Sequence, residues 1–165
     1  MKIGSPLHNI PKNRCPIRRD MTGRLVTVMP IDPERHGNDL YNASCGPAGD
    51  PTGKMWIYMT FGPFKDKTEF RKWLAPQNQK DDPLVFAIVS KTDGKALGMA
   101  NYLRIVPQWA SCEVGSIWFS PALQQTPMAT EAMYLMAFHI FEELGYRRYE
   151  WKCDSLNEAS RRAAL

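Results

Sequence analysis

The spacing of apolar residues changes after residue 119, from that of strands to that of a helix, and this change limits the folds that the chain can adopt. Residues 84–89 (LVFAIV) form an unbroken apolar run that ends in a turn, as in a buried strand followed by a hairpin. Two further strand-like segments follow at 96–106 and 112–119. From 127 to 144, by contrast, apolar residues recur three and four positions apart, as on one side of a helix. The pattern predicts an antiparallel meander followed by a long helix.

The other segments complete a mixed α/β (α+β) pattern. Residues 24–31 and 148–154 have the composition of strands. Residues 34–42 and 64–74 are expected to form helices, and a last helix begins at residue 157. We therefore expect the order β-α-α-β-β-β-α-β-α. In this arrangement helices flank a mixed, mainly antiparallel sheet.

The composition fits one globular domain that follows a basic N-terminal arm. The chain has 165 residues, of which 44% are apolar and 23% are charged, and its formal net charge is +4. Residues 1–23 combine basic side chains with three prolines and no apolar period, so we expect a flexible arm there and a domain over 24–165. The arm could touch RNA or a membrane surface, but its composition favours a solvated tail. We expect no membrane partner and no nucleic-acid partner.

The cysteines indicate neither a disulfide framework nor a zinc site. They are far apart and include no C-x-x-C pair, at positions Cys15, Cys45, Cys112 and Cys153. We expect no metal. The sequence also lacks an apolar run of the length of a signal peptide or a membrane span. We expect a cytoplasmic protein in a reducing compartment.

The junction between the strand and the long helix has the features of a phosphate site. Thr126 is placed to cap a helix whose first residue is Pro127. The backbone N–H groups of Met128, Ala129 and Thr130 then lie at the helix start, where the helix dipole also favours negative charge. The alternative is that a capped core helix has no ligand at all.

The same junction resembles the acyl-CoA motif of the GNAT family of acetyl-CoA-dependent N-acetyltransferases. That motif reads Gln/Arg-x-x-Gly-x-Gly/Ala and begins three residues after a proline, here Pro121. Gln124 and Ala129 agree with it, whereas Pro127 replaces the first Gly and removes one backbone donor. Further stretches resemble the ribosomal-protein N-acetyltransferase branch: Ala129-Thr130-Glu131-Ala132, residues 141–148, and Asn157 with Ser160.

The resemblance implies that acetyl-CoA is the co-substrate and that a primary amine of a small molecule or protein attacks it directly. It also implies that the pyrophosphate lies on backbone amides of the junction and that the pantetheine arm lies along the preceding strand. The amide of Phe119 would face the thioester carbonyl and stabilise its oxyanion. The expected cofactor contacts are Ile117, Phe119, Gln124, Gln125, Thr126, Met128, Ala129, Thr130 and Asn157.

Three side chains are candidates for catalysis. Amide formation needs a base, and Glu113 lies in the strand that leads to the junction. The resemblance implies that Asn157 contacts the cofactor arm or holds a water. Many family members place a Tyr acid where this chain has Ala164, and Ser160 is the substitute that we consider. The structural alternatives are an ion pair for Glu113, a helix N-cap for Asn157 and an ordinary helix residue for Ser160.

Family members usually continue past this last helix with two more strands. The resemblance therefore implies a chain that is truncated at its C-terminus, with a sheet edge that could pair in a homodimer. A catalytically impaired module that binds CoA or a partner is the alternative function. Loops within residues 33–64 are expected to select the acceptor.

Overall fold

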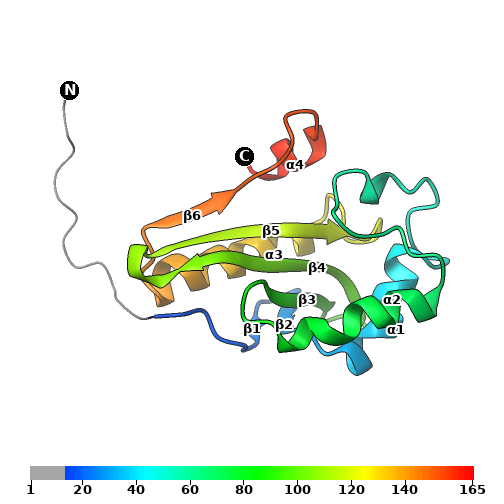
Figure 1. The fold of residues 1–165 in the computed structure, drawn as a ribbon, viewed down its shortest axis with the longest axis horizontal. Coiled ribbons are helices and arrows are strands. Elements are labelled where there is room, and N and C mark those ends of the chain that lie inside the picture. The colour runs from blue at the N-terminus through cyan, green and yellow to red at the C-terminus, as the bar shows by residue number, and fades with distance from the viewer. Residues whose placement is uncertain (1–13) are drawn as a thin grey trace.

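The computed structural model describes residues 14–165, and these form a six-stranded sheet in sequence order (Figure 1). All neighbouring strands are antiparallel except β5 and β6, which are parallel. The strands are β1 (Met21–Thr22), β2 (Val26–Pro30), β3 (Leu84–Ser90), β4 (Ala96–Val106), β5 (Ser111–Phe119) and β6 (Arg148–Trp151). The helices are α1 (Pro33–Ser44), α2 (Lys67–Leu74), α3 (Pro127–Phe138) and α4 (Glu158–Ala163). The expected fold class and element order are confirmed, with the two-residue strand β1 in addition.

Local sequence explains where the first two helices begin. The carboxylate of Asp32 accepts hydrogen bonds from the amides of Glu34 (2.9 Å) and Arg35 (3.1 Å), which caps α1. Asp66 caps α2 in the same way, through the amide of Glu69 at 2.9 Å. These caps satisfy N–H groups that have no partner within the helix.

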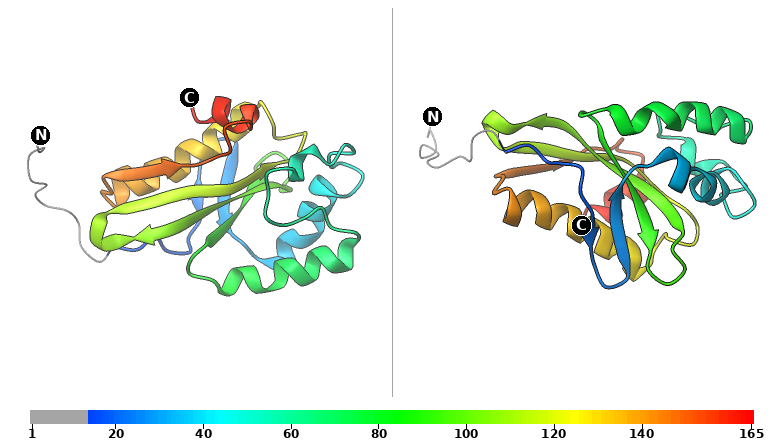
Figure 2. Two further views of the ribbon diagram at one scale, coloured as in Figure 1. Left: turned by 45° about the horizontal axis from the view of Figure 1, so that its top comes forward. Right: turned by 90° about the horizontal axis from the view of Figure 1, so that it is seen from below.

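Two apolar cores lie on opposite faces of the sheet. On one face α3 packs over side chains such as Phe86 and Tyr102, and on the other α1 and α2 pack over Val85 and Met99. Figure 2 shows the sheet between these two helical layers. Strand β3 is buried along its whole length because it has a core on each side, which explains its unbroken apolar run.

Several predicted elements are shorter than expected, two of them beside β5 or the junction that follows it. The helix predicted over 127–144 is α-helical only to Phe138 and continues as a π-helical turn, His139–Glu143, before Gly145 adopts a positive φ of 68°. The strand predicted over 148–154 ends at Trp151, because β6 pairs with β5 over only four residues.

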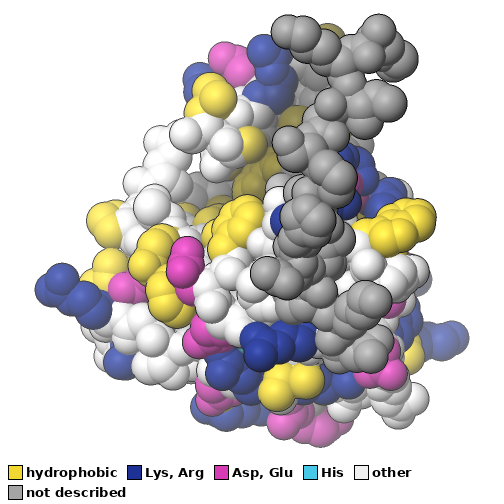
Figure 3. All heavy atoms as spheres, turned by 90° about the vertical axis from the view of Figure 1, so that its left-hand side faces the viewer, with side chains coloured by type: hydrophobic (Ala, Val, Ile, Leu, Met, Phe, Trp, Pro, Cys, Tyr) yellow, Lys and Arg dark blue, Asp and Glu magenta, His cyan; other side chains and the backbone are white. Residues whose placement is uncertain are grey.

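The described part of the predicted arm packs on the domain. The hydroxyl of Tyr146 donates to the carbonyl of Arg14 at 2.6 Å, and Arg18 pairs with Asp81 at 2.7 Å. Met21 is buried and pairs with β2. Residues 14–23 of the predicted arm thus contact the domain, and residues 1–13 lie outside the described part. Figure 3 shows basic and acidic side chains intermixed at this end of the molecule.

Two further findings concern membrane spans and cysteines. In the part of the chain that the structure describes, no helix has both the length and the apolar character to cross a membrane. All four cysteines are unpaired.

Candidate functional site

Strand β5 has one half that is paired on both sides and one half that is paired on one side. Strand β6 pairs with it only up to Val114, opposite Trp151. Beyond that point β6 ends, and the chain leads away from β5 toward α4 (Figure 1). No described strand therefore pairs with the outer edge of β5 over 115–119. A bulge lies where this free edge begins, because Ser116 has a positive φ of 48° and the register with β4 shifts there. An extended ligand chain can pair with such an edge.

The junction after β5 is a compact turn that is held by its own backbone. The amide of Ser120 donates to the carbonyl of Leu97 at 2.9 Å, and the fully buried Leu123 anchors the middle of the turn. The side chain of Gln124 donates to the carbonyl of Phe119 at 2.8 Å, so it supports the end of the strand. Gln125 has a φ of 56°, a left-handed conformation that non-glycine residues adopt at some cost.

The predicted cap of α3 is present. The hydroxyl of Thr126 accepts from the amide of Ala129 at 3.3 Å and donates to the carbonyl of Leu123 at 2.7 Å. The amides of Ala129 and Thr130 both donate to the carbonyl of Thr126. Among the described residues, no acceptor pairs with the amides of Gln125, Thr126 and Met128. The resemblance implies that five junction amides bind the pyrophosphate, those of Gln125, Thr126, Met128, Ala129 and Thr130. Three of the five are therefore available, and Pro127 has no N–H.

A carboxylate fixes the start of α3 against the turn between β1 and β2. The side chain of Glu131 accepts three backbone hydrogen bonds, from Arg24 (2.8 Å), Leu25 (2.7 Å) and Val26 (2.9 Å). Burial alone would raise the pKa of Glu131, but these hydrogen bonds outweigh it and lower the pKa. Gly23 permits this approach, since a Cβ there would lie 2.5 Å from the Glu131 carboxylate. In the sequence, Glu131 stood out only as part of the stretch Ala129-Thr130-Glu131-Ala132, which resembles the ribosomal-protein N-acetyltransferase branch.

An open hollow adjoins the free amides. Its volume is about 760 Å³, and its lining comes from the β1–β2 turn, the end of the junction and the first two turns of α3: Leu25, Gln125, Thr126, Pro127, Thr130, Glu131 and Tyr134.

Glu113 lies in the paired half of β5, within a cluster of charges. It is only 4% exposed, and its Oε2 contacts the guanidinium of Arg104 and the Nζ of Lys152, the latter at 2.7 Å. Lys152 also contacts Glu150, and its hydrogen bonds to Glu113 and Glu150 raise the pKa of Lys152. The ion pair expected as the structural alternative is thus present.

The structure separates Glu113 from the junction. Phe119 lies six residues further along β5, which is about 20 Å in an extended strand. The carboxylate of Glu113 reaches instead over Gly115, where its Oε1 lies 3.4 Å from the position of a Cβ. Glu113 and the amide of Phe119 therefore cannot serve the same carbonyl group. Of the two backbone contacts expected for the cofactor arm, Ile117 lies closer to Glu113 than Phe119 does.

Asn157 and Ser160 lie in the segment that begins α4. The side chain of Asn157 accepts from the amide of Ser160 at 3.1 Å, so it is the N-cap that was expected as an alternative. The hydroxyl of Ser160 accepts from the indole N–H of Trp151 at 2.9 Å, which ties α4 to β6. Because β5 and β6 are parallel, their carboxyl ends lie at the same end of the sheet. Asn157 and Ser160 follow β6 at this end, and the junction follows β5 there.

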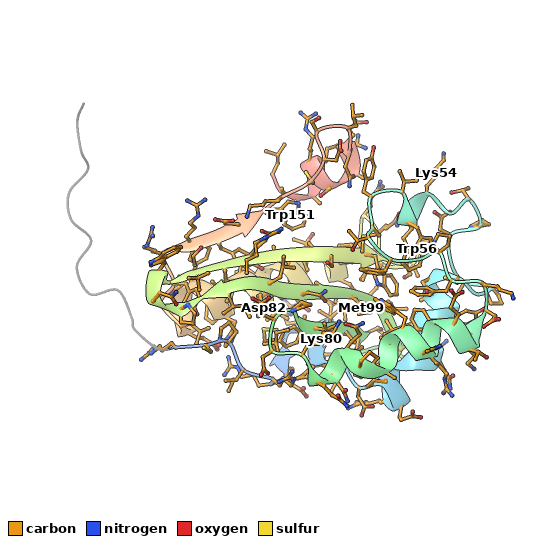
Figure 4. All side chains as sticks on the ribbon, in the orientation of Figure 1. Lys54, Trp56, Lys80, Asp82, Met99 and Trp151 are labelled. Atoms are coloured by element: carbon orange, nitrogen blue, oxygen red, sulfur yellow. The ribbon has the colours of Figure 1, made fainter. Side chains whose placement is uncertain are left out.

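An aromatic wall stands beside the free half of β5, and three of its members, Trp56, Phe61 and Phe64, belong to the segment expected to select the acceptor. Trp56, from the segment after α1, packs on Trp118 with ring centroids 6.0 Å apart, and Figure 4 shows Trp56 over the end of β4 that carries Met99. The indole N–H of Trp118 is buried and has no hydrogen-bond partner among the described residues. The wall also includes Phe61, Phe64 and Trp73.

The comparison with protein families decides the assignment. A model of the acetyltransferase (GNAT) domain matches residues 29–165. The chain belongs to the GNAT acetyltransferase family. A GCN5-related N-acetyltransferase from Brucella melitensis is 36% identical, with a TM-score of 0.89 over 96% of this chain and 70% of that chain. A structure from Chromobacterium violaceum, described as a GNAT-family acetyltransferase, is 34% identical, with a TM-score of 0.86 over 99% of this chain and 80% of that chain.

More distant structures share the GNAT fold alone. The ribosomal L7/L12 alpha-N-protein acetyltransferase is 16% identical, with a TM-score of 0.70 over 88% of this chain and 77% of that chain. A search of curated proteins finds no match. The family and the two similar structures identify a GNAT-type N-acetyltransferase. In residues 14–165 no group of three or more His, Cys, Asp or Glu side chains is arranged to hold a metal ion.

Proposed function

We propose that this GNAT enzyme transfers an acetyl group from acetyl-CoA to a primary amine of a small molecule or protein. One observation carries the proposal: the free edge of β5 is followed, after one compact turn, by three unpaired amides at and just before the start of α3. An acyl-CoA molecule joins an extended arm, which can pair with a strand, to a pyrophosphate, which suits a helix start. The residues fit both parts.

The residues that would hold acetyl-CoA supply backbone groups. The amides of Gln125, Thr126 and Met128 would bind the pyrophosphate, and the dipole of α3 would add to their attraction. The backbone of Ile117 and Phe119 would pair with the arm. Acetyl-CoA supplies an acetyl group that is activated as a thioester.

The acyl end of the arm belongs near the bulge of β5, which lies between the junction and Glu113. We propose that the carboxylate of Glu113 accepts the proton that the acceptor's ammonium group loses. The neutral nitrogen forms a bond to the acetyl carbon and the C–S bond breaks. The nitrogen gives up its second proton to the departing sulfur, so the products are the N-acetylated acceptor and the thiol of coenzyme A. The amide of Ile117, rather than that of Phe119, would then stabilise the oxyanion, because it lies closer to the carboxylate of Glu113.

A binding and a turnover experiment together test the proposed function. Acetyl-CoA at about 100 times its dissociation constant should stabilise the protein by about 2.7 kcal/mol, as measured by thermal unfolding. Acetyl-pantetheine, which lacks the phosphates, should stabilise it less. Thiol release should follow when alkylamines, amino-acid amides or peptides with a free N-terminus are added. Absence of stabilisation would refute acyl-CoA binding, and stabilisation without thiol release for any amine would support the binding-module alternative.

A further inference from the structure

We propose that the space over Gly115 is the binding slot for the acceptor's amine and that Asn101 is a second acceptor of its hydrogen bonds, beside Glu113. This inference rests on the proposed function and deepens it. It assigns a role to a buried amide on the neighbouring strand β4.

The register of β4 and β5 brings these residues together. Asn101 is the partner of Gly115, and Leu103 is the partner of Glu113. Side chains alternate along a strand, so Asn101 shares the face of Met99, whose side chain lies in the core under α1 and α2. Partners on one face of an antiparallel pair stand about 5 Å apart at their Cβ atoms. The neighbour of Asn101 is a glycine, so β5 places no side chain of its own directly beside Asn101.

The carboxylate of Glu113 forms the other side of this space. A Cβ on Gly115 would lie 3.4 Å from Oε1 of Glu113 and 3.1 Å from Cδ2 of Leu103. Both cations that contact Glu113, Arg104 and Lys152, are bound at Oε2. Oε1 accepts no hydrogen bond from the described residues, so it is available on the side of Gly115.

The side-chain oxygen of Asn101 lacks a hydrogen-bond donor within residues 14–165. The residue is 6% exposed, and its buried Oδ1 has no hydrogen-bond partner in the described part of the chain. A buried acceptor that lacks a partner destabilises a fold by about 1–3 kcal/mol, so it calls for an explanation, and a bound donor is one. Asn101 and Glu113 lie on the same face of neighbouring strands, so a donor with more than one N–H would serve both of their free oxygens. A primary ammonium has three.

The slot lies where the proposed reaction needs an amine. Gly115 is the first residue of β5 beyond its pairing with β6, so the slot meets the free edge that would hold the acyl arm. The Nζ of Lys152, at 2.7 Å from Oε2 of Glu113, shows that this carboxylate binds a primary ammonium. The side chain of Leu103 narrows the space, which favours a primary amine over a tertiary one.

Nuclear magnetic resonance of the full chain, saturated with coenzyme A, tests the slot directly. The probe is n-butylamine, with n-butanol as the uncharged control of the same length. We expect n-butylamine, and not n-butanol, to shift the side-chain amide of Asn101 and the backbone amide of Gly115. Equal shifts with both probes, or no shift with n-butylamine, would overturn the proposal.

Three variants connect the slot to turnover. Asn101→Leu removes the acceptor and Gly115→Ala fills the slot, so each should raise KM for the amine about tenfold while KM for acetyl-CoA stays the same. Asn101→Asp keeps an oxygen at the same place and should retain a low KM for the amine. An unchanged amine KM in Asn101→Leu, or in Gly115→Ala where the first variant fails to fold, would refute the slot. Failure of coenzyme A to bind the unmodified protein would instead refute the proposed function, and this inference with it.

Discussion

The two halves of β5 differ in the kind of chemistry that they present. Over Ser111–Val114 the strand has a partner on each side, its backbone groups are used, and a buried carboxylate contacts two cations. Over 115–119 the strand pairs only with β4, so the backbone groups on its other side are available to a ligand. One strand thus presents side-chain chemistry at one end and backbone donors at the other. The difference arises because β6 leaves the sheet after four residues.

The largest expected effect concerns the paired half. Glu113→Gln should lower kcat about a hundredfold or more, because an amide cannot accept the proton of the ammonium group. The dissociation constant of coenzyme A should not change, since we propose that the backbone of the other half binds it. Thiol release and calorimetry measure the two quantities.

Glu150→Gln is the matched control for that variant. Glu150 contacts Lys152 in the same charge cluster, but it has no proposed catalytic role. Its kcat should stay close to that of the unmodified enzyme. An equal loss in both variants would mean that the cluster as a whole is structural, and the contrast between the two halves would fail.

The next effect concerns the position of α3 beside the free half. Gly23→Ala places a Cβ 2.5 Å from the carboxylate of Glu131, so the side chain must give up part of its three hydrogen bonds. We expect a loss of about 1–3 kcal/mol in the free energy of unfolding and a weaker affinity for coenzyme A. Gly37→Ala is the control, because its Cβ would meet Leu74 at an ordinary 3.5 Å. Equal behaviour of the two variants in urea unfolding would contradict the role of Gly23.

A smaller effect is expected at the cap of α3. Thr126→Ala removes the side-chain acceptor of the Ala129 amide and should lower the free energy of unfolding by about 1 kcal/mol. Coenzyme A should bind a few times more weakly, because the first turn of α3 is then less ordered. Thr126→Ser keeps the hydroxyl and should restore both properties. A serine variant that behaves like the alanine variant would show that the methyl group, and not the cap, is what matters.

The smallest effect is a dependence on pH. The pKa of Glu131 lies below its ordinary value of 4.5 in the folded protein, so its ionised form stabilises the fold. That stability is fully present above the unfolded value and is lost as the pH falls through the lower, folded value. The difference in unfolding free energy between the unmodified protein and Glu131→Gln should therefore be constant near neutral pH and shrink below about pH 4.5. A difference that persists in acid would show that packing, and not charge, is responsible.

Local patterns predicted a large part of this fold and the helix start on which one half of the candidate site rests. The apolar run of β3 and the helical spacing after Pro127 identify their elements, since both periods follow from backbone geometry alone. Thr126 and Pro127 mark the start of α3 for the same reason, and the cap is where it was expected. The free amides of the junction follow from that start.

The other half of the site was decided by contacts between distant residues. No local pattern shows that β6 leaves β5 after Val114, that Asn101 faces Gly115, or that Glu131 lies against Gly23. Each depends on strand register or on how a helix lies on the sheet. The sequence by itself determined the elements and the helix start, because these need only neighbouring residues. Only the tertiary structure decided which carboxylate, amide and glycine meet, because pairing brings together residues that the chain keeps apart.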